Sequence, residues 1–425
     1  MITSPAFRGK RYAVLGLARS GVATVDALLA GGADVTAWDS REEARAAAPS
    51  GVTLADPLEV DLAGYDGVVV SPGVPLNKHP IAGKARQAGV PVIGDIELFA
   101  EARAALPPHK VVGITGTNGK STTTALIHHI LETAGVPSLM GGNIGLPILG
   151  RDPLAEGGVY VLELSSYQID LTRSLDCEVA VLTNITPDHL DRYDGFAGYA
   201  ASKERLFAMQ SADHVAVIAT EDDETRRIAA KLSQRLVAVS SRAIADQSRW
   251  PALQGPHNAQ NVACAIAACK ALGPAEEAIE QGLRTYPGLP HRMERIAEKA
   301  GVLYVNDSKA TNATATAPAL AAYPAIHWIL GGLPKTDDLD DCEPFFDHVR
   351  AAYTIGQAGP MFARILRAAG KPVIESGTLD QAIRDAAAAA RPGEVVMLSP
   401  ACASFDQFTD YEARGEAFRA GVGAL

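Results

Sequence analysis

Residues 111–124 read Val-Val-Gly-Ile-Thr-Gly-Thr-Asn-Gly-Lys-Ser-Thr-Thr-Thr. This segment predicts a strand, a glycine-rich turn and a helix, an arrangement that points backbone N–H groups and the positive helix end at phosphate oxygens. We expect Lys120 to lie against the β- and γ-phosphates of a nucleotide and the Ser121 hydroxyl to hold Mg²⁺. Ile114 stands where the usual phosphate loop has its first glycine, so the loop is a variant. A tight turn with an exposed lysine is the alternative, but it leaves the coincidence of these features unexplained.

The length and composition are those of a globular protein with more than one domain. The chain has 425 residues, or two to three domains at roughly 150 residues each. Apolar residues make up 47%, charged residues 20%, and mean hydropathy is +0.05, which excludes a disordered chain. The net charge of −11 gives no general attraction to nucleic acid or to anionic lipid. Any bound anion therefore needs a local cluster of cations, backbone N–H groups or metal.

Cysteine usage and hydropathy indicate the compartment. The five cysteines form no C-x-x-C pair, so we expect neither a disulfide framework nor a zinc site, and a reducing cytoplasm is the simplest setting. The first residues lack the apolar run of a signal peptide. The longest uncharged segment, residues 310–334, contains Pro318 and Pro324 and is not expected to cross a membrane. A monomer is the default expectation.

Strand-like and helix-like segments alternate along the chain, which favours doubly wound parallel sheets. Pro107-Pro108 and the segment 286–290 interrupt this alternation. We predict an α/β protein with three domains: a Rossmann-like domain at 1–105, a central P-loop ATPase-like parallel-sheet domain at 106–288, and a Rossmann-like domain at 289–425. The expected strands are residues 12–15, 34–38, 67–70, 111–115, 159–163, 179–184, 215–219, 302–306, 326–330, 353–356, 373–374 and 395–399.

Acidic and histidine side chains follow two expected strands of the central domain. Glu163 ends an apolar strand, where a direct or second-layer Mg²⁺ ligand beside a phosphate loop is expected. Asp188, His189 and Asp191 follow the next strand, and strand ends in open α/β sheets face the ligand crevice. His189 is a candidate ligand of a second metal, or alternatively a residue of a polar loop that caps a helix.

Four motifs together resemble the Mur ligases, ATP-dependent amide-forming enzymes of peptidoglycan synthesis: Gly116-Thr-Asn-Gly-Lys-Ser-Thr122, Glu163-Leu-Ser-Ser-Tyr-Gln168, Asn184-Ile-Thr-Pro-Asp-His189 and His257-Asn-Ala-Gln-Asn261. The resemblance covers all three domains. Asn306-Asp-Ser-Lys-Ala-Thr-Asn312 and Leu398-Ser-Pro-Ala-Cys-Ala-Ser404 narrow it to the branch that adds D-glutamate. It implies that ATP activates the carboxylate of UDP-N-acetylmuramoyl-L-alanine as an acyl phosphate, which the amine of D-glutamate then attacks.

The resemblance also implies an ATP and metal site. Catalytic roles fall to Lys120, His189, Lys203 and Lys309. Two Mg²⁺ ions would be held by Ser121, Glu163, His189 and, as a carbamate, Lys203. ATP contacts are Gly116, Thr117, Asn118, Gly119, Lys120, Ser121, Thr122, Asn258, Asn261, Arg292 and Asp307. Without the resemblance Lys203 reads as a solvated helix lysine, and Asp307 to Lys309 as a polar turn.

Two substrate-binding sets complete the implied site. The UDP-linked substrate would contact Arg19, Ser20, Asp39, Ser40, Gly73, Asn143 and Ser165. D-Glutamate would contact Thr311, Lys335, Ser404, Phe405 and Tyr411. Independently of the resemblance, Ser404-Phe-Asp-Gln407 has the pattern of a helix capping box. Cys402 shows no sign of a base partner that would make it a nucleophile.

Three other functions fit parts of the sequence. Gly16-Leu-Ala-Arg-Ser-Gly21 followed by Asp39 resembles a dinucleotide fingerprint, but Ala18 replaces its middle glycine and would crowd a pyrophosphate. A nucleotide-binding switch without ligase chemistry would share the phosphate loop. A different amino-acid ligase, such as a folylpolyglutamate synthase or another Mur enzyme, would share the chemistry. The segment 306–312 and the unit from Gly16 to Asp39 argue against the last two.

Overall fold

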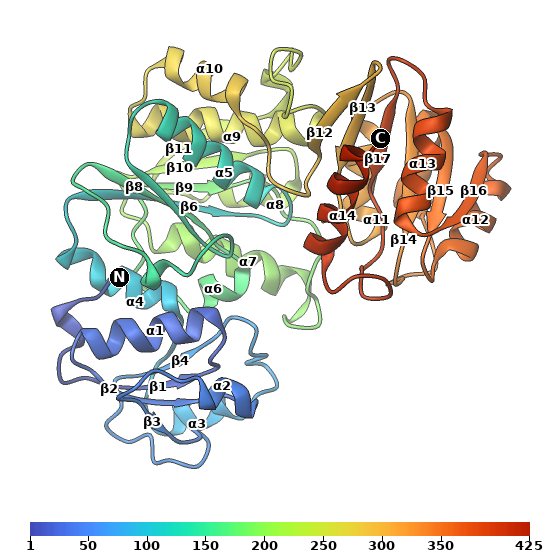
Figure 1. Cartoon of the computed structure of the whole chain (residues 1–425). Coiled ribbons are helices and arrows are strands. Elements are labelled where there is room, and N and C mark those ends of the chain that lie inside the picture. The colour runs from blue at the N-terminus through green and yellow to red at the C-terminus, as the bar shows by residue number, and fades with distance from the viewer. The chain divides into compact units, whose positions relative to one another are not determined.

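The computed structural model describes residues 1–425, and the chain divides into two compact units. The first comprises residues 1–243 and 260–282, and the second comprises residues 244–259 and 283–425. The first unit contains two sheets and the second contains one, and every sheet is accompanied by helices (Figure 1). The predicted α/β class with three sheet-based domains is confirmed, whereas the predicted boundaries at 105/106 and 288/289 stay predictions.

The first sheet has five strands in the order β3-β2-β1-β4-β5, all parallel. Its strands are β1 (Arg11–Leu15), β2 (Asp34–Trp38), β3 (Thr53–Leu54), β4 (Gly67–Val70) and β5 (Val92–Ile93). The connecting helices are α1 (Arg19–Ala30), α2 (Glu42–Ala46), α3 (Ile81–Gln87) and α4 (Asp95–Ala102). The central strands β1 and β4 are buried over almost their whole length, as expected for a sheet covered on both faces.

The second sheet has six parallel strands in the order β11-β10-β9-β6-β8-β7. Its strands are β6 (His109–Thr115), β7 (Ser138–Gly142), β8 (Gly158–Glu163), β9 (Val179–Leu182), β10 (Val215–Ala219) and β11 (Arg235–Val239). The helices are α5 (Lys120–Thr133), α6 (Ser166–Asp170), α7 (Gly195–Ala208), α8 (Asp223–Ala229), α9 (Pro256–Leu272) and α10 (Glu276–Thr285). The carboxyl ends of β6, β8 and β9 therefore meet at one edge, where the predicted site residues lie.

One apolar core joins these two sheets. Phe99 of α4 packs edge-on against Tyr160 of β8, with ring centroids 5.1 Å apart. Tyr12 of β1 and Leu162 of β8 belong to the same buried cluster. An interdomain contact of this kind restricts relative motion when it is large and apolar, which accounts for the first two sheets forming one unit.

The second unit contains a six-stranded sheet in the order β12-β13-β17-β14-β15-β16. Its strands are β12 (Glu294–Lys299), β13 (Val302–Asn306), β14 (Ile326–Gly331), β15 (Val349–Ile355), β16 (Val373–Gly377) and β17 (Val395–Leu398). The helices are α11 (Ala313–Ala321), α12 (Gly359–Ala368), α13 (Leu379–Ala389) and α14 (Tyr411–Gly423). Trp328 and Ile329, adjacent on β14, belong to separate clusters on the two faces, because successive strand residues point to opposite sides.

The edge strand β12 corrects the prediction of a wholly parallel C-terminal sheet. It runs antiparallel to β13, and Lys299 pairs with Val302. Ala300 and Gly301 between them both have positive φ, at 49° and 74°. Two such residues form the tight turn that joins antiparallel strands. The dipeptide Ala-Gly is not a typical hairpin signal, so the sequence did not reveal this strand.

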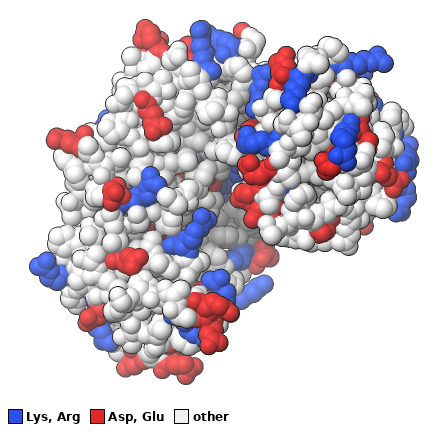
Figure 2. Space-filling model, viewed as in Figure 1, with Lys and Arg blue, Asp and Glu red and all other residues white.

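No helix of the structure combines the length and apolar character needed to cross a bilayer. Lys and Arg side chains are interspersed with Asp and Glu over the face of each unit that Figure 2 shows.

Candidate functional site

The loop between β6 and α5 requires glycine at two positions. Gly116 has φ +148°, and a Cβ atom there would lie 2.0 Å from Thr183 Oγ1. Gly119 has φ +83°, and its Cβ would lie 2.1 Å from Asn261 Oδ1. Both positions combine left-handed backbone with a close approach, and only glycine meets both demands. The loop thus brings its backbone directly to the start of α5, as the phosphate-loop prediction requires.

Thr183 and Asn184, in the loop after β9, hold the phosphate loop in place. Thr117 N–H donates to Asn184 O (2.8 Å), and Asn118 N–H donates to Asn184 Oδ1 (2.8 Å). Asn118 O accepts from Thr183 Oγ1 (2.7 Å). The amides of Thr117 and Asn118 are therefore engaged with the protein, and α5 begins two residues later, so that its positive end faces the loop.

Lys120 and Lys203 converge on one carbonyl oxygen. Lys120 Nζ donates to Gly116 O (2.9 Å) and Thr117 O (2.7 Å), and Lys203 Nζ donates to the same Gly116 O (2.8 Å). Lys203 lies on α7, is 1% exposed and has its Nζ 4.6 Å from the centre of the Tyr199 ring. Burial, followed by the positive charge of Lys120, lowers the pKa of Lys203 well below its ordinary value. The structure thus places Lys203 beside the phosphate loop and away from solvent.

Glu163 ends β8 with one carboxylate oxygen satisfied and the other not. Oε1 accepts from Asn143 Nδ2 (2.8 Å), and Asn143 N–H donates to Glu163 O (2.8 Å). Oε2 is buried without a hydrogen-bond partner, and the residue is 2% exposed. A buried carboxylate oxygen of this kind needs a cation, a proton or a water molecule. It therefore fits the donor set expected for a hard divalent cation.

His189 lies in a loop tied to the phosphate loop. Its backbone has φ 52°, and its ring contacts Tyr167 and Tyr199 at centroid distances of 5.1 and 6.3 Å. Thr117 Oγ1 accepts from Thr186 N–H (3.0 Å) and lies 3.2 Å from Tyr199 Oη. The loop that carries His189 is thus hydrogen-bonded to the phosphate loop. No group of three or more His, Cys, Asp or Glu side chains converges as a metal site.

The two asparagines of α9 have different surroundings. Asn261 Oδ1 accepts from Thr123 Oγ1 of α5 (3.3 Å) and lies against Gly119. Asn258 Nδ2 donates to Gln254 O (2.9 Å). Both side chains are buried, with 2% and 5% exposure. Asn261 thus contacts the phosphate-loop helix.

Asp39, at the end of β2, organises the loop after β1. Its Oδ2 accepts from Leu17 N–H (2.8 Å) and its Oδ1 from Arg41 N–H (2.9 Å). Burial alone would raise the pKa of Asp39, but the hydrogen bonds from Arg41 and Leu17 outweigh it and lower the pKa to about 2. Arg19 and Ser20 form the first turn of α1 directly after this loop. The residues predicted to bind the UDP-linked substrate differ in exposure here. Asp39 is buried, Ser20 is half-buried, and Arg19 and Ser40 are exposed.

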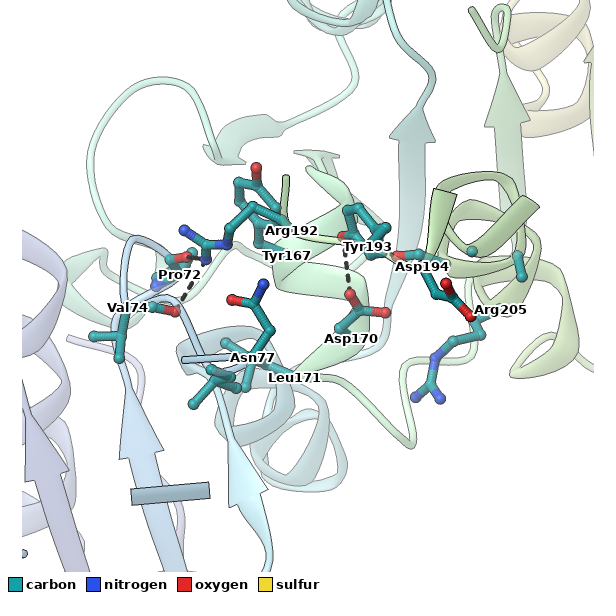
Figure 3. A pocket seen from close by; sticks show the side chains of 14 residues that line it. Pro72, Val74, Asn77, Tyr167, Asp170, Leu171, Arg192, Tyr193, Asp194 and Arg205 are labelled. Atoms are coloured by element: carbon teal, nitrogen blue, oxygen red, sulfur yellow. Dashed lines mark hydrogen bonds between the residues drawn. The ribbon is translucent and has the colours of Figure 1, made fainter. Parts of the chain in front are cut away.

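Arg192 connects the first sheet's loop at Gly73 to the histidine loop of the second (Figure 3). Its guanidinium donates to Val74 O (3.0 Å), lies 3.5 Å from Pro72 O and Gly73 O, and stacks on the Tyr167 ring at 4.3 Å. A cavity of about 470 Å³ opens beside this contact. Its lining residues include Asn77, Asp170, Tyr193, Ser202 and Arg205. Sequence reasoning missed Arg192 and Tyr167, although Arg192 lies three residues after His189.

Ser165 begins α6 with a complete capping box. Its hydroxyl accepts from Gln168 N–H (3.2 Å), and Ser165 N–H donates to Gln168 Oε1 (3.1 Å). This structural role was not predicted, whereas the capping box predicted at Ser404 is wrong. Ser404 and Gln407 lie in a turn, and α14 begins at Tyr411 with Asp410 as its cap. The Ser-x-x-Gln pattern is local, so it occurs where the following residues do not continue as a helix.

In the second unit, Asp307 follows β13 and is held on both carboxylate oxygens. Oδ1 accepts from Met293 N–H (3.1 Å) and Oδ2 from Ser399 Oγ (2.7 Å). Burial raises the pKa of Asp307 to about 7, against the opposing effect of these hydrogen bonds and of Arg292. Met293 has φ 48°. Burial therefore favours the protonated form of this carboxyl group.

Lys309 and the D-glutamate candidates surround the carboxyl ends of β13, β14 and β17. Lys309 Nζ lies 3.7 Å from the centre of the Tyr411 ring. Lys335 Nζ donates to Thr311 Oγ1 (3.0 Å). Ser404 is 2% exposed, but Phe405 is 68% exposed. The second unit thus pairs Lys335 with the Thr311 hydroxyl and Lys309 with the Tyr411 ring, and Phe405 stays at the surface.

Cys402 lies in this region as a buried thiol. All five cysteines are unpaired and buried. Burial raises the pKa of Cys402 to about 12, so it carries almost no thiolate at neutral pH. A nucleophilic cysteine requires the opposite shift.

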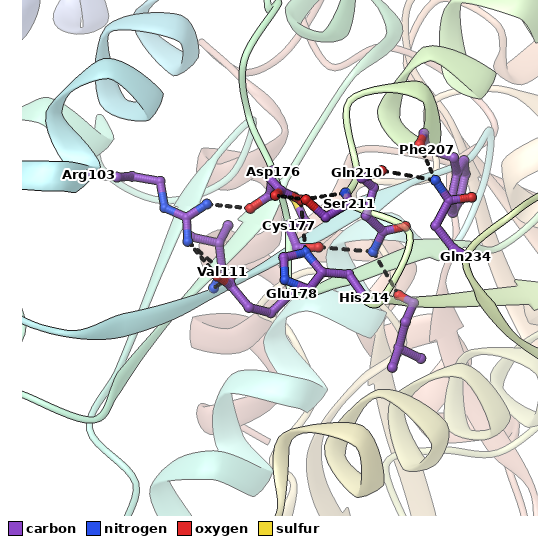
Figure 4. Close-up of polar contacts among 11 residues, drawn as sticks. Arg103, Val111, Asp176, Cys177, Glu178, Phe207, Gln210, Ser211, His214 and Gln234 are labelled. Carbon is purple, nitrogen blue, oxygen red and sulfur yellow. Dashed lines mark hydrogen bonds and ion pairs between the residues drawn. The ribbon is translucent and has the colours of Figure 1, made fainter.

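Another polar cluster lies at the amino ends of β6 and β9, the edge of the sheet opposite the phosphate loop (Figure 4). Glu178 accepts from Arg103 Nη2 (2.8 and 3.0 Å) and from Val111 N–H (2.6 Å). Asp176 accepts from Ser211 Oγ (2.5 Å) and contacts His214 Nδ1 (2.8 Å). These contacts connect the segment after α4 to the second sheet and have a structural role.

Three family models match consecutive parts of the chain. They are the Mur ligase MurD-like N-terminal domain at residues 10–94, the Mur ligase middle domain at 114–252, and the Mur ligase glutamate ligase domain at 291–402. Curated relatives match over its whole length. The UDP-N-acetylmuramoylalanine–D-glutamate ligase of Novosphingobium aromaticivorans is 66% identical over 100% of this chain and 97% of that protein. The protein of the same name from Zymomonas mobilis is 61% identical over 100% of both chains.

Solved structures of the same fold are more distant in sequence. A UDP-N-acetylmuramoylalanyl-D-glutamyl-2,6-diaminopimelate–D-alanyl-D-alanyl ligase from Acinetobacter baumannii aligns with a TM-score of 0.61 at 17% identity, covering 100% of this chain and 92% of that one. The UDP-N-acetylmuramate–alanine ligase MurC of Thermotoga maritima aligns with a TM-score of 0.58 at 16% identity, covering 98% and 99%. These structures show that the fold is shared, and the family models and the full-length relatives establish that the chain belongs to the Mur ligase family.

Proposed function

We propose that this chain joins D-glutamate to UDP-N-acetylmuramoyl-L-alanine at the expense of ATP, in cytoplasmic synthesis of peptidoglycan precursors. The observation that carries the proposal is full-length identity of 66% and 61% to relatives named for this activity. The phosphate loop and the buried carboxylate of Glu163 support the ATP-dependent step. The ammonium groups of Lys309 and Lys335, in the loops after β13 and β14, support recognition of an acidic amino acid.

The proposed reaction has two steps, phosphorylation of a carboxylate and displacement of the phosphate by an amine. A carboxylate oxygen of the UDP-linked substrate forms a bond to the γ-phosphorus of ATP, and the bond to the β-phosphate oxygen breaks to release ADP. The amine nitrogen of D-glutamate then attacks the acyl carbon, phosphate leaves, and the nitrogen loses a proton. Two unit negative charges 4 Å apart repel by about 1 kcal/mol in water and about 4 kcal/mol at an effective dielectric constant of 20. Fixed cations must therefore offset this repulsion.

Lys120 is proposed to supply one of these cations. Its ammonium group now donates to loop carbonyls, and it would exchange these contacts for the β- and γ-phosphates. The other phosphate contacts are proposed for the loop residues Gly116, Thr117, Asn118, Gly119, Ser121 and Thr122. Asn258, Asn261, Arg292 and Asp307 are proposed as the remaining ATP contacts.

Mur ligases use ATP with Mg²⁺, and the residues present fit a divalent cation. The fit rests on Glu163, whose buried Oε2 has no partner. Ser121 and Glu163 would hold the first ion, and His189 and a carbamylated Lys203 the second. Mg²⁺ takes few protein ligands and keeps water and phosphate oxygens as the rest. When bound, it supplies positive charge against the phosphoryl group and the attacking carboxylate.

The environment of Lys203 supports its proposed carbamylation. A free amine reacts with carbon dioxide to form a carbamate and releases a proton, whereas an ammonium group does not react. Burial and the neighbouring Lys120 favour the neutral amine by lowering the pKa of Lys203. An anionic carbamate beside Lys120 would also relieve the repulsion between the two lysines. Intact-protein mass spectrometry and ¹³C NMR with labelled bicarbonate would detect this group without reference to activity.

The substrate contacts remain a proposal with local support. Arg19, Ser20, Asp39, Ser40 and Gly73 would bind the UDP group at the first turn of α1, and Asn143 and Ser165 would contact the muramoyl group. Thr311, Lys335, Ser404, Phe405 and Tyr411 would bind D-glutamate, and Lys309 would contact the acyl phosphate.

The test is ADP release with UDP-N-acetylmuramoyl-L-alanine, ATP and Mg²⁺, with D-glutamate, L-glutamate or no amino acid. We expect ADP and an equal amount of new amide only with D-glutamate. Lys120→Ala should abolish ADP formation while circular dichroism stays unchanged. Lys371→Ala, which removes an ion pair with Asp347 (3.5 Å), is the matched control. Equal ADP release with and without an amino acid would contradict the ligase proposal and favour a nucleotide-hydrolysing switch.

A further inference from the structure

Arg414 is an almost completely buried arginine without an acidic partner. It lies on α14 and is 1% exposed. Its guanidinium makes hydrogen bonds only to neutral oxygens: Nε to Ser308 Oγ (3.0 Å), Nη2 to Ser308 O (2.9 Å) and Cys402 O (3.0 Å), and Nη1 to Ala403 O (3.3 Å). Burial lowers the pKa of Arg414 to about 10, which still leaves the group charged at neutral pH.

The four acceptor oxygens belong to two loops that follow neighbouring strands. Ser308 follows β13 and lies between Asp307 and Lys309. Cys402 and Ala403 follow β17, which pairs with β13. The Ser308 hydroxyl also donates to Tyr411 O (2.8 Å) in the first turn of α14. One side chain therefore contacts the immediate neighbours of several proposed ligand residues and none of those residues itself.

A third loop is connected through the same contact. Leu333 and Ala403 exchange backbone hydrogen bonds of 2.9 and 3.0 Å. At Gly332, with φ +133°, a Cβ atom would lie 2.3 Å from Ala403 O and 3.1 Å from Arg414 Nη1. This loop carries Lys335. The position of Ala403 O thus affects both the Arg414 contact and the loop of Lys335.

A contribution to stability alone does not explain why an arginine is buried here. Burying an unpaired charge costs several kcal/mol, and apolar residues of similar volume often stabilise a core better than buried charges do. The guanidinium has a rigid planar fork with donors that reach two loops at once. A lysine offers donors from a single point and cannot span both loops.

We propose that Arg414 is a positioning residue for amide formation, which sets the spacing between the loop of Asp307 and Lys309 and the loop of Ser404. The inference rests on the proposed function, because D-glutamate and the acyl phosphate are the ligands these loops would contact. Displacement of either loop by about 1 Å is enough to cost on the order of 100-fold in rate.

The test compares the steady-state kinetics of Arg414→Lys and wild type in the ADP-release assay. We expect the KM for D-glutamate to rise and kcat to fall, together by about 10- to 100-fold in kcat/KM. The KM for the UDP-linked substrate should stay within about twofold, because its proposed contacts lie in the first unit. Leu366→Ala is the matched control, since this residue of α12 is fully buried and is not a proposed ligand contact. It should lower Tm and leave both KM values unchanged.

Ser308→Ala is the second variant if Arg414→Lys fails to fold, because it removes one acceptor and no charge. It should raise the KM for D-glutamate in the same direction but less. Wild-type values of KM and kcat in either folded variant would overturn the positioning role. Wild-type protein without D-glutamate-dependent ADP release would instead overturn the proposed function, so the two failures are distinguishable.

Discussion

Asp307 makes the stability of the second unit depend on pH. Burial raises the pKa of this carboxyl group from 3.8 to about 7 in the folded protein, and the hydrogen bonds from Ser399 and Met293 reduce the shift without cancelling it. In the unfolded chain the same group ionises near 3.8. Folding therefore favours the protonated form. The stabilisation is fully present below pH 4 and is lost as the pH rises through 7.

The shift gives the size of the effect. A change of about 3 units at roughly 1.4 kcal/mol per unit corresponds to ~4 kcal/mol. The group is enclosed by protein, so solvent screening does not reduce this figure as it does for exposed pairs. We expect the Asp307 contribution to the free energy of unfolding to fall by up to this amount between pH 4 and 8. The steepest slope should lie between pH 5 and 7.

Asp307→Asn removes the titration and keeps the shape. The amide oxygen can accept from Met293 N–H, and the amide nitrogen can donate to Ser399 Oγ. The Ser399 hydroxyl can then turn to Thr316 Oγ1, 3.2 Å away. At pH 5 the variant and wild type should be similarly stable. At pH 8 the variant should be more stable by several kcal/mol, because only wild type must bury a charge.

Urea unfolding followed by Trp328 fluorescence measures this difference. Trp328 is buried in the second unit, and its Nε1 donates to Ser399 O (2.7 Å). Replacing Trp38 and Trp250 by Phe leaves Trp328 as the single reporter. Asp347→Asn is the control, since that carboxylate is fully exposed and should not alter the pH profile. Parallel pH profiles for Asp307→Asn and wild type would refute the argument.

Two further substitutions test the first unit. Gly119→Ala places a Cβ atom 2.1 Å from Asn261 Oδ1 in left-handed backbone. That conformation alone costs alanine ~1–2 kcal/mol, so ATP affinity measured by calorimetry should fall at least tenfold, and unchanged affinity would contradict the loop geometry. Arg103→Met leaves the carboxylate of Glu178 without its cation and should reduce the unfolding free energy in urea by ~1–3 kcal/mol. Lys10→Met, which removes a more exposed ion pair, should change it by less than ~1 kcal/mol.

Strand prediction succeeded where apolar runs were buried on both faces. Four predicted strands have the same bounds as strands of the structure: 34–38, 67–70, 215–219 and 302–306. Of the strands at the sheet edges, β16 was predicted at 373–374, and the others were missed. β3 and β5 have only two residues each, which is too short for an apolar pattern. β11 (Arg235–Val239) is largely exposed, although four of its five residues are apolar. Edge strands are recognised by their pairing, which a single sequence does not contain.

Sequence by itself determined the phosphate loop and the family. The loop is a local structure: Gly116 and Gly119 permit its backbone conformation, and Lys120 follows directly, so neighbouring residues are sufficient to predict it. The resemblance to Mur ligases rests on motifs of the same local kind. The Ser404 capping box shows the limit of such motifs, because its four residues do not decide whether a helix follows.

Only the tertiary structure decided which charges are buried. Lys203, Asp307 and Arg414 look like ordinary surface residues in the sequence, yet each is at most 7% exposed. Their burial comes from segments far away in the chain. Lys203 contacts Gly116, and Arg414 contacts Ser308 and Cys402. Ionisation and hydrogen bonding depend on solvent exposure, and solvent exposure exists only after these segments have packed.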